Sequence, residues 1–480
     1  MYYFLISIGV VALSVQAFIG LSFLISCIWE NERRASLFAA LQFFCMLALL
    51  FIYFLLISAG FFRTVIGVCL LIAAYIVSGI AIYNLARKTT PNKMALQGAR
   101  GYVVGDFDRY DEREQVFARN RSLSAGTSRY RQFYKDHPEL EEIDAKRRER
   151  GGPLGVLGSI DKPHGSPNVA ATLAGLSIPM TLSSAKAVNP RPLSKPQDNP
   201  VTISPEEATL RIKGFARNIG ADLVGIAKID PFWMYSRRGE IFHDNWEDWG
   251  RELPVDHQYA VILAEEMDFR MVGTAPHTPS VMESMKNYAK GAYLSTQVAA
   301  FIANLGYEAT TNHLRHYTAI LPPLAADAGL GQVGRLGYLM TKELGARLRL
   351  SAVTTNLPLV PDQPVDMGIE DFCRLCKKCA DCCPSHSIPE DDEPKEHRGA
   401  LKWKLNAETC FDYWGKIGTD CCVCMRVCPW SHARTFPHRL IVWLITRNKH
   451  SRKIFKKMDD IFYGKKPKPK NPPSWASFSL

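Results

Sequence analysis

Cysteine is nearly absent from most of this sequence. Its 480 residues contain 13 cysteines, of which Cys27, Cys45 and Cys69 lie in apolar runs near the start and the other ten fall between positions 373 and 428. A secreted protein held by disulfides spreads its cysteines through the fold, so this distribution argues against a disulfide framework. A thiol in an apolar run is usually a small hydrophobe. We therefore expect the ten clustered cysteines to be ligands.

Charge is absent from three long apolar stretches, at 2–29, 36–62 and 64–85. Each is long enough to cross a bilayer, which takes about 20 apolar residues in a helix. No basic residue precedes the first stretch and two more follow it, which argues against a cleavable signal peptide. The sequence predicts an all-α, three-helix transmembrane anchor over 1–88. An unusually apolar, buried helical bundle is the alternative.

Basic residues flank these stretches unevenly. Arg33 and Arg34 lie between the first two, three basic residues follow the third at 87–93, and only Arg63 separates the second from the third. Short loops rich in lysine and arginine stay in the cytoplasm. This asymmetry favours a multi-pass protein of the (inner) cell membrane, with the N-terminus outside and the large C-terminal part in the cytoplasm.

Residues 89–200 have the composition of a linker or N-terminal extension. An arginine-rich stretch at 144–155 gives way to glycine and proline, and 189–200 reads as a linker. The milder apolar run at 168–187 contains Pro179 and several hydroxyl residues. We expect a packed or interfacial segment there and not a fourth span.

Helix and strand patterns alternate after position 200. Ser204 and Glu207 have the spacing of a capping box with Pro205 at the first helical position, so a helix should begin here. A longer helical pattern covers about 279–305. Apolar strand patterns occupy 221–229, 259–267 and 347–355, the second of them buried on both faces. The alternation predicts an α/β layered domain over 201–368.

A glycine motif, GLGQVG at 329–334, matches G-x-G-x-x-G. The preceding residues do not form a convincing strand, and no acidic residue stands clearly at the expected distance, so a dinucleotide site is weakly supported. We expect Gly329, Gly331 and Gly334 to form a turn that lets the backbone approach another bound group.

The clustered cysteines form two sets with the spacing of bacterial ferredoxins, each ending before a proline. In that arrangement the last cysteine of each set binds the cluster of the other set. The predicted ligands of one [4Fe–4S] cluster are Cys373, Cys376, Cys379 and Cys428, and those of the second are Cys383, Cys410, Cys421 and Cys424.

Structural zinc in paired Cys-x2-Cys knuckles is the alternative, although zinc does not call for a third cysteine at the same interval and a fourth before proline, twice. Cys382 and Cys422 fall outside the spacing and are expected to be packed neighbours. Two iron–sulfur clusters would pass single electrons, so the sequence predicts a redox protein.

The chain resembles the corrinoid-dependent reductive dehalogenases over most of 200–463. The resemblance is carried by TLRIKGFARNIGADLVGIAKI, by DAGLGQVGRLGYLMT, by the run from GARLRLSAVTT through PLVPDQP to the first cysteine set, and by CFDYWGKIGTDCCVCMRVCPWSH. It implies a cobalamin in a nitroreductase-like α/β domain, then a ferredoxin-like two-cluster domain at 369–435 and a C-terminal helix and basic tail at 436–480. The implied reaction converts R–X, two electrons and a proton into R–H and halide.

The resemblance also implies site residues. Tyr288 matches the family's proton donor and Arg349 its basic partner, with Arg347 as the fallback. A nearby guanidinium should lower the pKa of the tyrosine from about 10. Asn312 matches a pocket asparagine with a register displaced by about two positions. The implied contacts to the cofactor are Gly329, Gly331, Gly334, Ser431 and His432.

Two departures from the family concern the membrane and the electron donor. Exported members begin with a twin-arginine signal and use a separate membrane anchor, whereas this chain has fused apolar runs, which suggests a cytoplasmic catalytic domain. The basic stretch 447–470 is a solvated terminus, a contact with anionic lipid, or a docking surface for an acidic low-potential donor such as a ferredoxin or flavodoxin; a membrane carrier is a further possible donor. No nucleic-acid partner is expected, since no stacking aromatics accompany the charge.

Two other functions compete with dehalogenation of a small organohalide. One is a cobalamin and iron–sulfur reductase of another substrate, like the epoxyqueuosine reductases. The other is an electron-transfer subunit of a membrane complex, which would contain iron but no cobalt.

Overall fold

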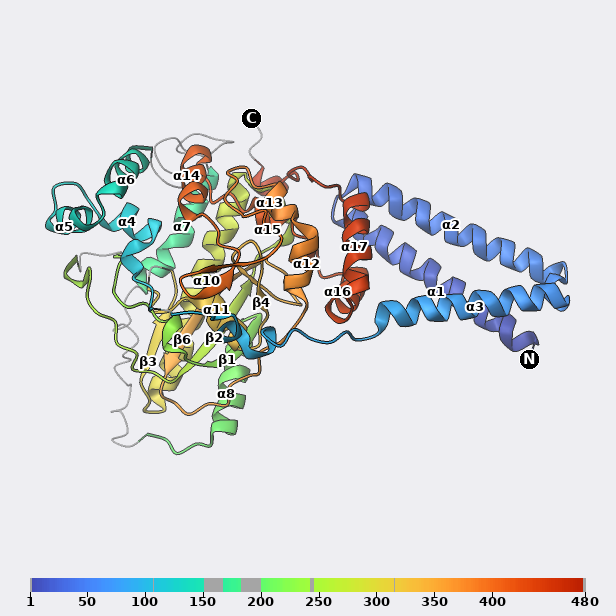
Figure 1. The fold of residues 1–480 in the computed structure, drawn as a ribbon, viewed down its shortest axis with the longest axis horizontal. Coiled ribbons are helices and arrows are strands. Elements are labelled where there is room, and N and C mark those ends of the chain that lie inside the picture. The colour runs from blue at the N-terminus through green and yellow to red at the C-terminus, as the bar shows by residue number, and fades with distance from the viewer. Residues whose placement is uncertain are drawn as a thin grey trace. The chain divides into compact units, whose positions relative to one another are not determined.

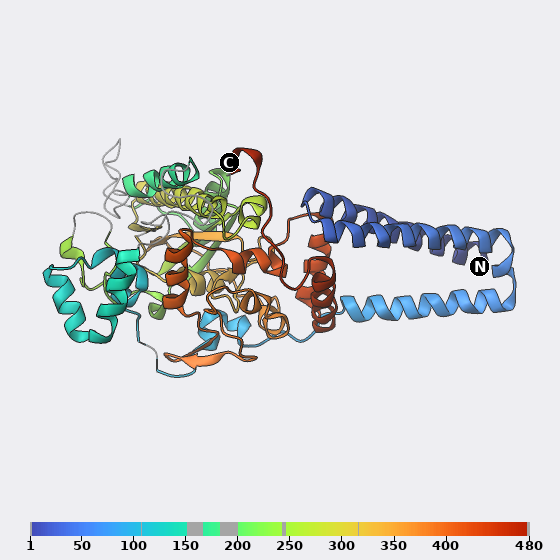
Figure 2. The same cartoon turned by 90° about the horizontal axis from the view of Figure 1, so that it is seen from above.

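The structure is a computed structural model that describes residues 2–106, 108–150, 167–182, 200–241, 246–314 and 316–477. The chain divides into two compact units (Figures 1 and 2). We call them the helical unit, made of residues 1–90 and 432–468, and the sheet unit, made of residues 91–431 and 469–480. The linker predicted at 189–200 lies, apart from Pro200, outside the described residues.

The helical unit contains the three apolar stretches as long helices. They are α1 (Tyr2–Trp29), α2 (Arg33–Ser58) and α3 (Val65–Ala86), with the short turn η1 (Phe61–Arg63) between the last two. By length and composition all three could cross a membrane. Large apolar side chains such as Leu37 and Val65 are mostly exposed along them. Such surface is unfavourable in water and suits a lipid environment, so membrane anchoring is supported.

Two C-terminal helices pack in the same unit, although we expected them in a separate tail. The helices α16 (Phe436–Arg447) and α17 (Lys449–Phe462) meet the three apolar helices at one end (Figure 1). Arg34 donates to the carbonyl of Ile461 at 2.8 Å, and Ser451 donates to the carbonyl of Leu85 at 2.7 Å. Sequence analysis did not predict this packing, because α17 contains many basic residues and only a narrow apolar face.

The sheet unit is built on four strands in the order β1 (Leu223–Lys228), β2 (Tyr259–Glu266), β6 (Leu348–Thr355) and β3 (Ala309–Asn312). Three strand predictions and the burial of the second on both faces are confirmed. All neighbouring strands run antiparallel. The expected layering of helices on a sheet is present, but strand direction could not be read from alternating patterns.

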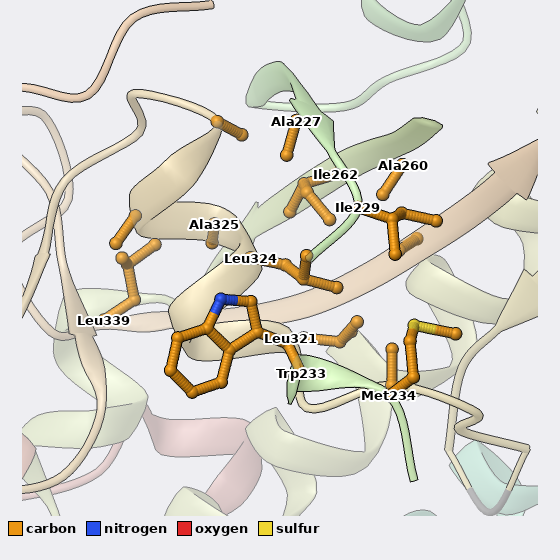
Figure 3. Packing of buried hydrophobic residues seen from close by; sticks show 14 of the residues in the cluster. Ala227, Ile229, Trp233, Met234, Ala260, Ile262, Leu321, Leu324, Ala325 and Leu339 are labelled. Carbon is orange, nitrogen blue, oxygen red and sulfur yellow. The ribbon is translucent and has the colours of Figure 1, made fainter. Parts of the chain in front are cut away.

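Helices cover both faces of this sheet. Along β2 the side chains alternate: Val261 and Leu263 pack with α8 (Pro205–Asn218) and α10 (Thr278–Asn304), while Ala260 and Ile262 pack on the other side. That second core, with α11 (Leu321–Asp327), is seen in Figure 3. Successive side chains of a strand point to opposite faces, so a strand covered on both sides reads as a continuous apolar run.

The apolar run at 168–187 forms α7 (Pro167–Thr181), which packs along α10. A Cβ on Gly175 would lie 2.8 Å from the Cβ of Met285, so the two helices approach closely at this glycine. A packed segment in place of a fourth span is therefore what the described part of this run forms.

Much of the region expected to be a linker is folded. It contains α4 (Val116–Ser122), α5 (Ser128–Asp136) and α6 (Pro138–Arg150), preceded by η2 (Ala95–Tyr102) and η3 (Glu112–Glu114). Asp144, fully buried, pairs with Arg119 at 2.7 Å and with Arg147 at 2.6 Å. Composition suggested a linker because these charged residues are rarely buried, and here they are buried as pairs.

The remaining elements lie around the glycine motif, the two cysteine sets and the sheet edges. They are η5 (Pro231–Trp233), η6 (Trp246–Asp248), α9 (Phe269–Gly273), β4 (Gln332–Val333), β5 (Leu339–Met340), α12 (Ile369–Cys376), α13 (Lys378–Asp381), β7 (Lys395–His397), β8 (Ala400–Lys402), α14 (Ala407–Ile417), α15 (Val423–Val427), η7 (Pro429–Ser431) and η8 (Ser474–Ala476).

Replacing Asp144 by asparagine should destabilise the sheet unit. The change removes one of the carboxylates that neutralise two buried guanidinium groups, and breaking a buried pair of this kind costs about 3 kcal/mol. We expect a clear fall in the midpoint of thermal unfolding, measured by scanning fluorimetry of the full chain. Glu142→Gln is the control, because its ion pair with Lys146 is exposed. Equal midpoints for the two variants would contradict the role given to this network.

Candidate active site

Tyr288 and Arg349, far apart in the sequence, lie together in the sheet unit. Tyr288 is on α10, and Arg349 is on β6, whose neighbouring Ser351 lies against α10 at Gly291. The guanidinium carbon of Arg349 is 5.2 Å from the centre of the Tyr288 ring. Both side chains are partly exposed, so the pair is accessible to a bound molecule.

The expected direction of the Tyr288 pKa is wrong. Desolvation raises the pKa above 10.0, and the positive charge of Arg349 only opposes this rise. The negative charges of Asp420 and Cys422 add to the increase. A raised pKa keeps the phenol protonated at neutral pH, which is the form that can donate a proton.

Arg349 is held by groups from two other segments. Its Nη2 donates to Ser284 Oγ at 2.8 Å and lies 3.3 Å from Asp420 Oδ2, while Ser284 also donates to Asp420. The Cys422 sulfur is 3.9 Å from the same nitrogen. Among the described residues, the buried Nε of Arg349 has no hydrogen-bond partner. A buried donor of this kind is what a bound acceptor would satisfy.

Arg347, the fallback partner of Tyr288, points elsewhere. Its Nε donates to the carbonyl of Ser431 at 2.7 Å, and its Nη2 lies 3.3 Å from Glu266. The side chain is 1% exposed. These contacts fit a residue that fastens the end of the cysteine segment to the sheet.

Asn312 lies at the end of β3, fully buried, with its amide in use. The side-chain oxygen accepts from the backbone N–H of Thr318 at 2.6 Å and from its hydroxyl at 2.9 Å. These bonds fix the loop after β3. The described contacts do not bring Asn312 together with Tyr288 or Arg349.

Other residues near the pair were not identified from the sequence. Glu265 on β2 stands opposite Arg349 in the strand register and accepts from Ser351 at 2.8 Å. Burial raises its pKa well above the ordinary value. Burial raises the pKa of Tyr317 well above its ordinary value, and the nearby Tyr288 and Glu265 add to the rise. The sequence carried a signal for Glu265 alone: Glu265 and Glu266 stand together at the end of a strand that was predicted to be buried on both faces.

The second set of predicted cluster ligands surrounds one cavity. Its walls include Cys383, Cys410, Cys421 and Cys424, together with Tyr338 and Arg349. Burial raises the pKa of Cys410 to about 11, and the nearby Cys383 adds to the rise. Burial alone would raise the pKa of Cys383, but hydrogen bonds from Ser385 and Ser387 lower it. Several cysteine sulfurs around one cavity are a donor set that soft metal centres bind as thiolates.

The first set gathers in the same way. Burial raises the pKa of Cys379, and the charges of Cys373, Cys428 and Cys376 contribute next. Arg335, directly after the glycine motif, donates to the carbonyl of Cys373 at 3.2 Å. This arginine is a further contact that the spacing of cysteines did not reveal.

The spacing of the sulfur atoms bears on the zinc alternative. Four sulfurs around one zinc ion at 2.3 Å would lie about 3.8 Å apart. Among the described residues, the potential ligand atoms that meet within 4.8 Å in groups of three or more include no cysteine set. The all-thiolate donor sets and their ferredoxin spacing in the sequence fit iron–sulfur clusters better than single ions.

The glycine motif contacts protein atoms at each glycine. A Cβ on Gly329 would lie 2.4 Å from the carbonyl oxygen of Gln363, and one on Gly331 would lie 2.0 Å from that of Met340. At Gly334 it would lie 2.3 Å from the Met340 sulfur and 3.6 Å from that of Cys373. The motif therefore packs β4 against β5 and brings backbone close to the first cysteine set.

Ser431 and His432 stand at the boundary of the two units. Ser431 accepts the backbone N–H of Ala346 at 3.3 Å, beside Gly345, where a Cβ would lie 2.1 Å from the carbonyl oxygen of Trp430. His432 belongs to the helical unit, where its Nε2 donates to Asp459 at 2.7 Å. The two residues therefore have different surroundings.

The chain is similar in sequence to reductive dehalogenases and, over a shorter stretch, to an epoxyqueuosine reductase. The chain is 34% identical over 277 residues to the tetrachloroethene reductive dehalogenase of Desulfitobacterium hafniense, which covers 49% of this chain and 50% of that protein. With the enzyme of the same name from Sulfurospirillum multivorans it shares 32% identity over 299 residues, 56% and 59% of the two chains. An epoxyqueuosine reductase of Lactococcus garvieae is 35% identical over 123 residues, 22% of this chain and 31% of that one.

Solved structures agree in fold. A catabolic reductive dehalogenase matches with a TM-score of 0.60 and 23% identity over 79% of this chain and 52% of the other. A complex of that protein with 3-bromo-4-hydroxybenzoic acid matches with a TM-score of 0.58 and 23% identity over 80% and 49%. No family model matches the chain.

These relatives confirm the resemblance to the reductive dehalogenase family and its fold. The chain spans about half the length of the curated relatives it matches.

Proposed function

We propose that the protein is a membrane-anchored oxidoreductase that removes halogen from a small organohalide. The observation that carries this proposal is the Tyr288–Arg349 pair, partly exposed, next to a cavity lined by five cysteines, among them the four predicted ligands of the second cluster. The reaction consumes two electrons and one proton and releases halide and R–H. Similarity to tetrachloroethene reductive dehalogenases supports the substrate class.

The proton comes from Tyr288. Its raised pKa keeps the phenol neutral until a strongly basic product is formed beside it. After transfer, the phenolate is stabilised by the guanidinium of Arg349, which Asp420 and Ser284 hold in place. Positioning of an acid and of the charge that stabilises its conjugate base is the general form of acid catalysis.

The chain's own residues supply the sites for two kinds of cofactor. The cysteine sets would hold two [4Fe–4S] clusters that pass single electrons, with Cys373, Cys376, Cys379 and Cys428 at one and Cys383, Cys410, Cys421 and Cys424 at the other. A cobalamin, when bound, supplies a low-potential cobalt that can reduce a carbon–halogen bond. Arg349, whose Nε has no hydrogen-bond partner among the described residues, would be a donor to a group bound beside it.

The charge distribution in the helical unit supports a topology. Arg33 and Arg34 lie at the end of the three apolar helices where α16 and α17 pack, and the many basic residues of α17 add to them, whereas Arg63 lies at the opposite end. Basic residues mark the cytoplasmic side. We infer three spans with this basic end in the cytoplasm, beside anionic headgroups that attract α17. The electron donor is a low-potential carrier such as a ferredoxin, a flavodoxin or a membrane carrier.

Replacing Tyr288 by phenylalanine should nearly abolish turnover without loss of the bound cofactors. The change keeps the ring and removes the proton, so halide release should fall by about 100-fold or more. The assay uses anaerobic, chemically reduced protein with a panel of halogenated alkenes, phenols and benzoates. Tyr293→Phe, an exposed tyrosine on the same helix, is the control. Full activity of Tyr288→Phe with unchanged cofactor content would rule out this proton donor.

Serine substitution distinguishes ligands from neighbouring cysteines. Cys421→Ser should lower the iron content of the anaerobically reconstituted protein from about eight atoms toward about four. Cys382→Ser should leave it unchanged, since Cys382 lies outside the ligand spacing. Iron is measured by elemental analysis together with visible absorbance. Equal iron in the two variants would contradict the ligand assignment.

A further inference from the structure

A buried carboxyl group lies next to the candidate active site and has no part in the mechanism described above. Glu265 on β2 is fully buried. Ser351 donates to its Oε1 at 2.8 Å, whereas Oε2 has no hydrogen-bond partner among the described residues. The buried Asp144, by contrast, is paired with two arginines. An ionised carboxylate that is buried and unpaired is costly, so the surroundings of Glu265 favour its neutral form.

The strand register and one glycine place this carboxyl close to Tyr288. Glu265 stands directly opposite Arg349, and opposite residues of neighbouring strands lie on the same face of a sheet. On that face a Cβ on Gly291 of α10 would lie 3.5 Å from Glu265 Oε1. Tyr288 precedes Gly291 by three positions, and residues three apart lie on one side of a helix. The carboxyl is therefore about one helical turn from the proposed proton donor.

Gly291 and Ser351 together fix the position of the carboxyl. A Cβ on Gly291 would lie 3.2 Å from Ser351 Oγ, so glycine leaves room for the Ser351–Glu265 hydrogen bond beneath α10. This bond occupies Oε1. The other oxygen, Oε2, is left to carry a proton.

A partly exposed ion pair lies on the other side of Glu265. Lys290 Nζ donates to Asp222 Oδ2 at 2.7 Å, and the two side chains are 34% and 29% exposed. Both charges reach Glu265, since Lys290 lowers its pKa and Asp222 raises it. Glu265 thus lies between a pair in contact with water and the Tyr288–Arg349 pair. A group in this position can take up a proton on its outer side and release it on its inner side.

Desolvation decides the protonation state of Glu265. It raises the pKa well above the ordinary value of a glutamate, and the hydrogen bond from Ser351, the charge of Lys290 and the residue's own backbone N–H only oppose the rise. Tyr317, the titratable neighbour from the loop after β3, has its own pKa raised in part by Glu265. Glu265 therefore holds a proton under conditions in which an exposed glutamate is ionised.

We infer that Glu265 stores the proton that restores Tyr288 after each turnover. The inference rests on the proposed dehalogenation. The phenolate of Tyr288 takes the proton of the Glu265 carboxyl, which gives a phenol and a carboxylate, and no electrons move. The carboxylate then takes a proton from water on the side of Lys290. A carboxylic acid is ordinarily a stronger acid than a phenol, so the first transfer is favourable. Glu265 acts through Tyr288 and needs no contact with the substrate.

Infrared difference spectroscopy of the full-length protein measures the protonation state of Glu265 without any turnover. The carbonyl stretching band of neutral, buried carboxyl groups should lose one component at neutral pH in Glu265→Gln relative to the wild type. Glu308→Gln is the control, because the Glu308 side chain is 79% exposed, and it should leave the band unchanged. A band that is the same in Glu265→Gln and in the wild type would overturn the inference.

Rapid mixing of the reduced, cofactor-loaded full chain with the best substrate of the halogenated panel separates the first turnover from later ones. Reductant is in excess, so that electron supply does not limit the rate. In Glu265→Gln the first release of halide should match the wild type, because Tyr288 starts protonated, and later turnovers should be severalfold slower. Glu265→Asp keeps a carboxyl and should recover part of the later rate, and Glu308→Gln should behave as the wild type.

The two turnover phases distinguish a proton store from a structural role. Equal slowing of the first and later turnovers in Glu265→Gln, or no slowing of either, would contradict the inference while halide release by the wild type still supports the proposed function. A wild type that releases no halide would contradict the proposed function itself, and with it this inference.

Discussion

The positive charge of Arg349, whose side chain is mostly but not fully buried, links the separate parts of the candidate active site. It is carried by a strand of the sheet, lies over the ring of Tyr288 on α10, and is balanced by Asp420 from the second cysteine segment. A guanidinium with 11% of its side chain exposed must be paired, and breaking such a pair is costly. The same pairing sets the distance between Tyr288 and the cysteine-lined cavity. Tyrosine, arginine and thiols therefore form one site only in the folded sheet unit.

The antiparallel sheet makes this arrangement possible. Strand alternation sends Arg349 and Ser351 to the face covered by α10, while the opposite face is closed by the core around α11. Glycines allow the cysteine segments to lie against this framework, as at Gly345 beside Trp430 and at Gly334 beside Cys373. A Cβ atom at Gly345 would clash with the carbonyl oxygen of Trp430, and one at Gly334 would clash with the sulfur of Met340.

Sequence patterns predicted the parts with local signals. The capping box at Ser204, the apolar strands and the ferredoxin spacing are local, and the structure has the corresponding helix, strands and grouped thiols. Features that depend on tertiary context were missed. Asp420 and Ser284 look like ordinary polar residues until β6 brings Arg349 to them. The pKa of Tyr288 was expected to fall because the resemblance to the family places a cation beside the tyrosine. Desolvation outweighs the effect of that cation and raises the pKa, and desolvation cannot be predicted from the sequence. Asp144, Arg119 and Arg147 were expected in a linker or extension, but all three are buried. The two arginines form ion pairs with Glu408 and Asp412 on α14.

The most direct test of the account is the cobalt content of the anaerobically reconstituted full-length protein after removal of free cobalamin. The account predicts about one corrinoid-bound cobalt per chain alongside about eight iron atoms. A protein that takes up its full complement of iron but retains no corrinoid would contradict a dehalogenase and would leave an electron carrier anchored to a membrane.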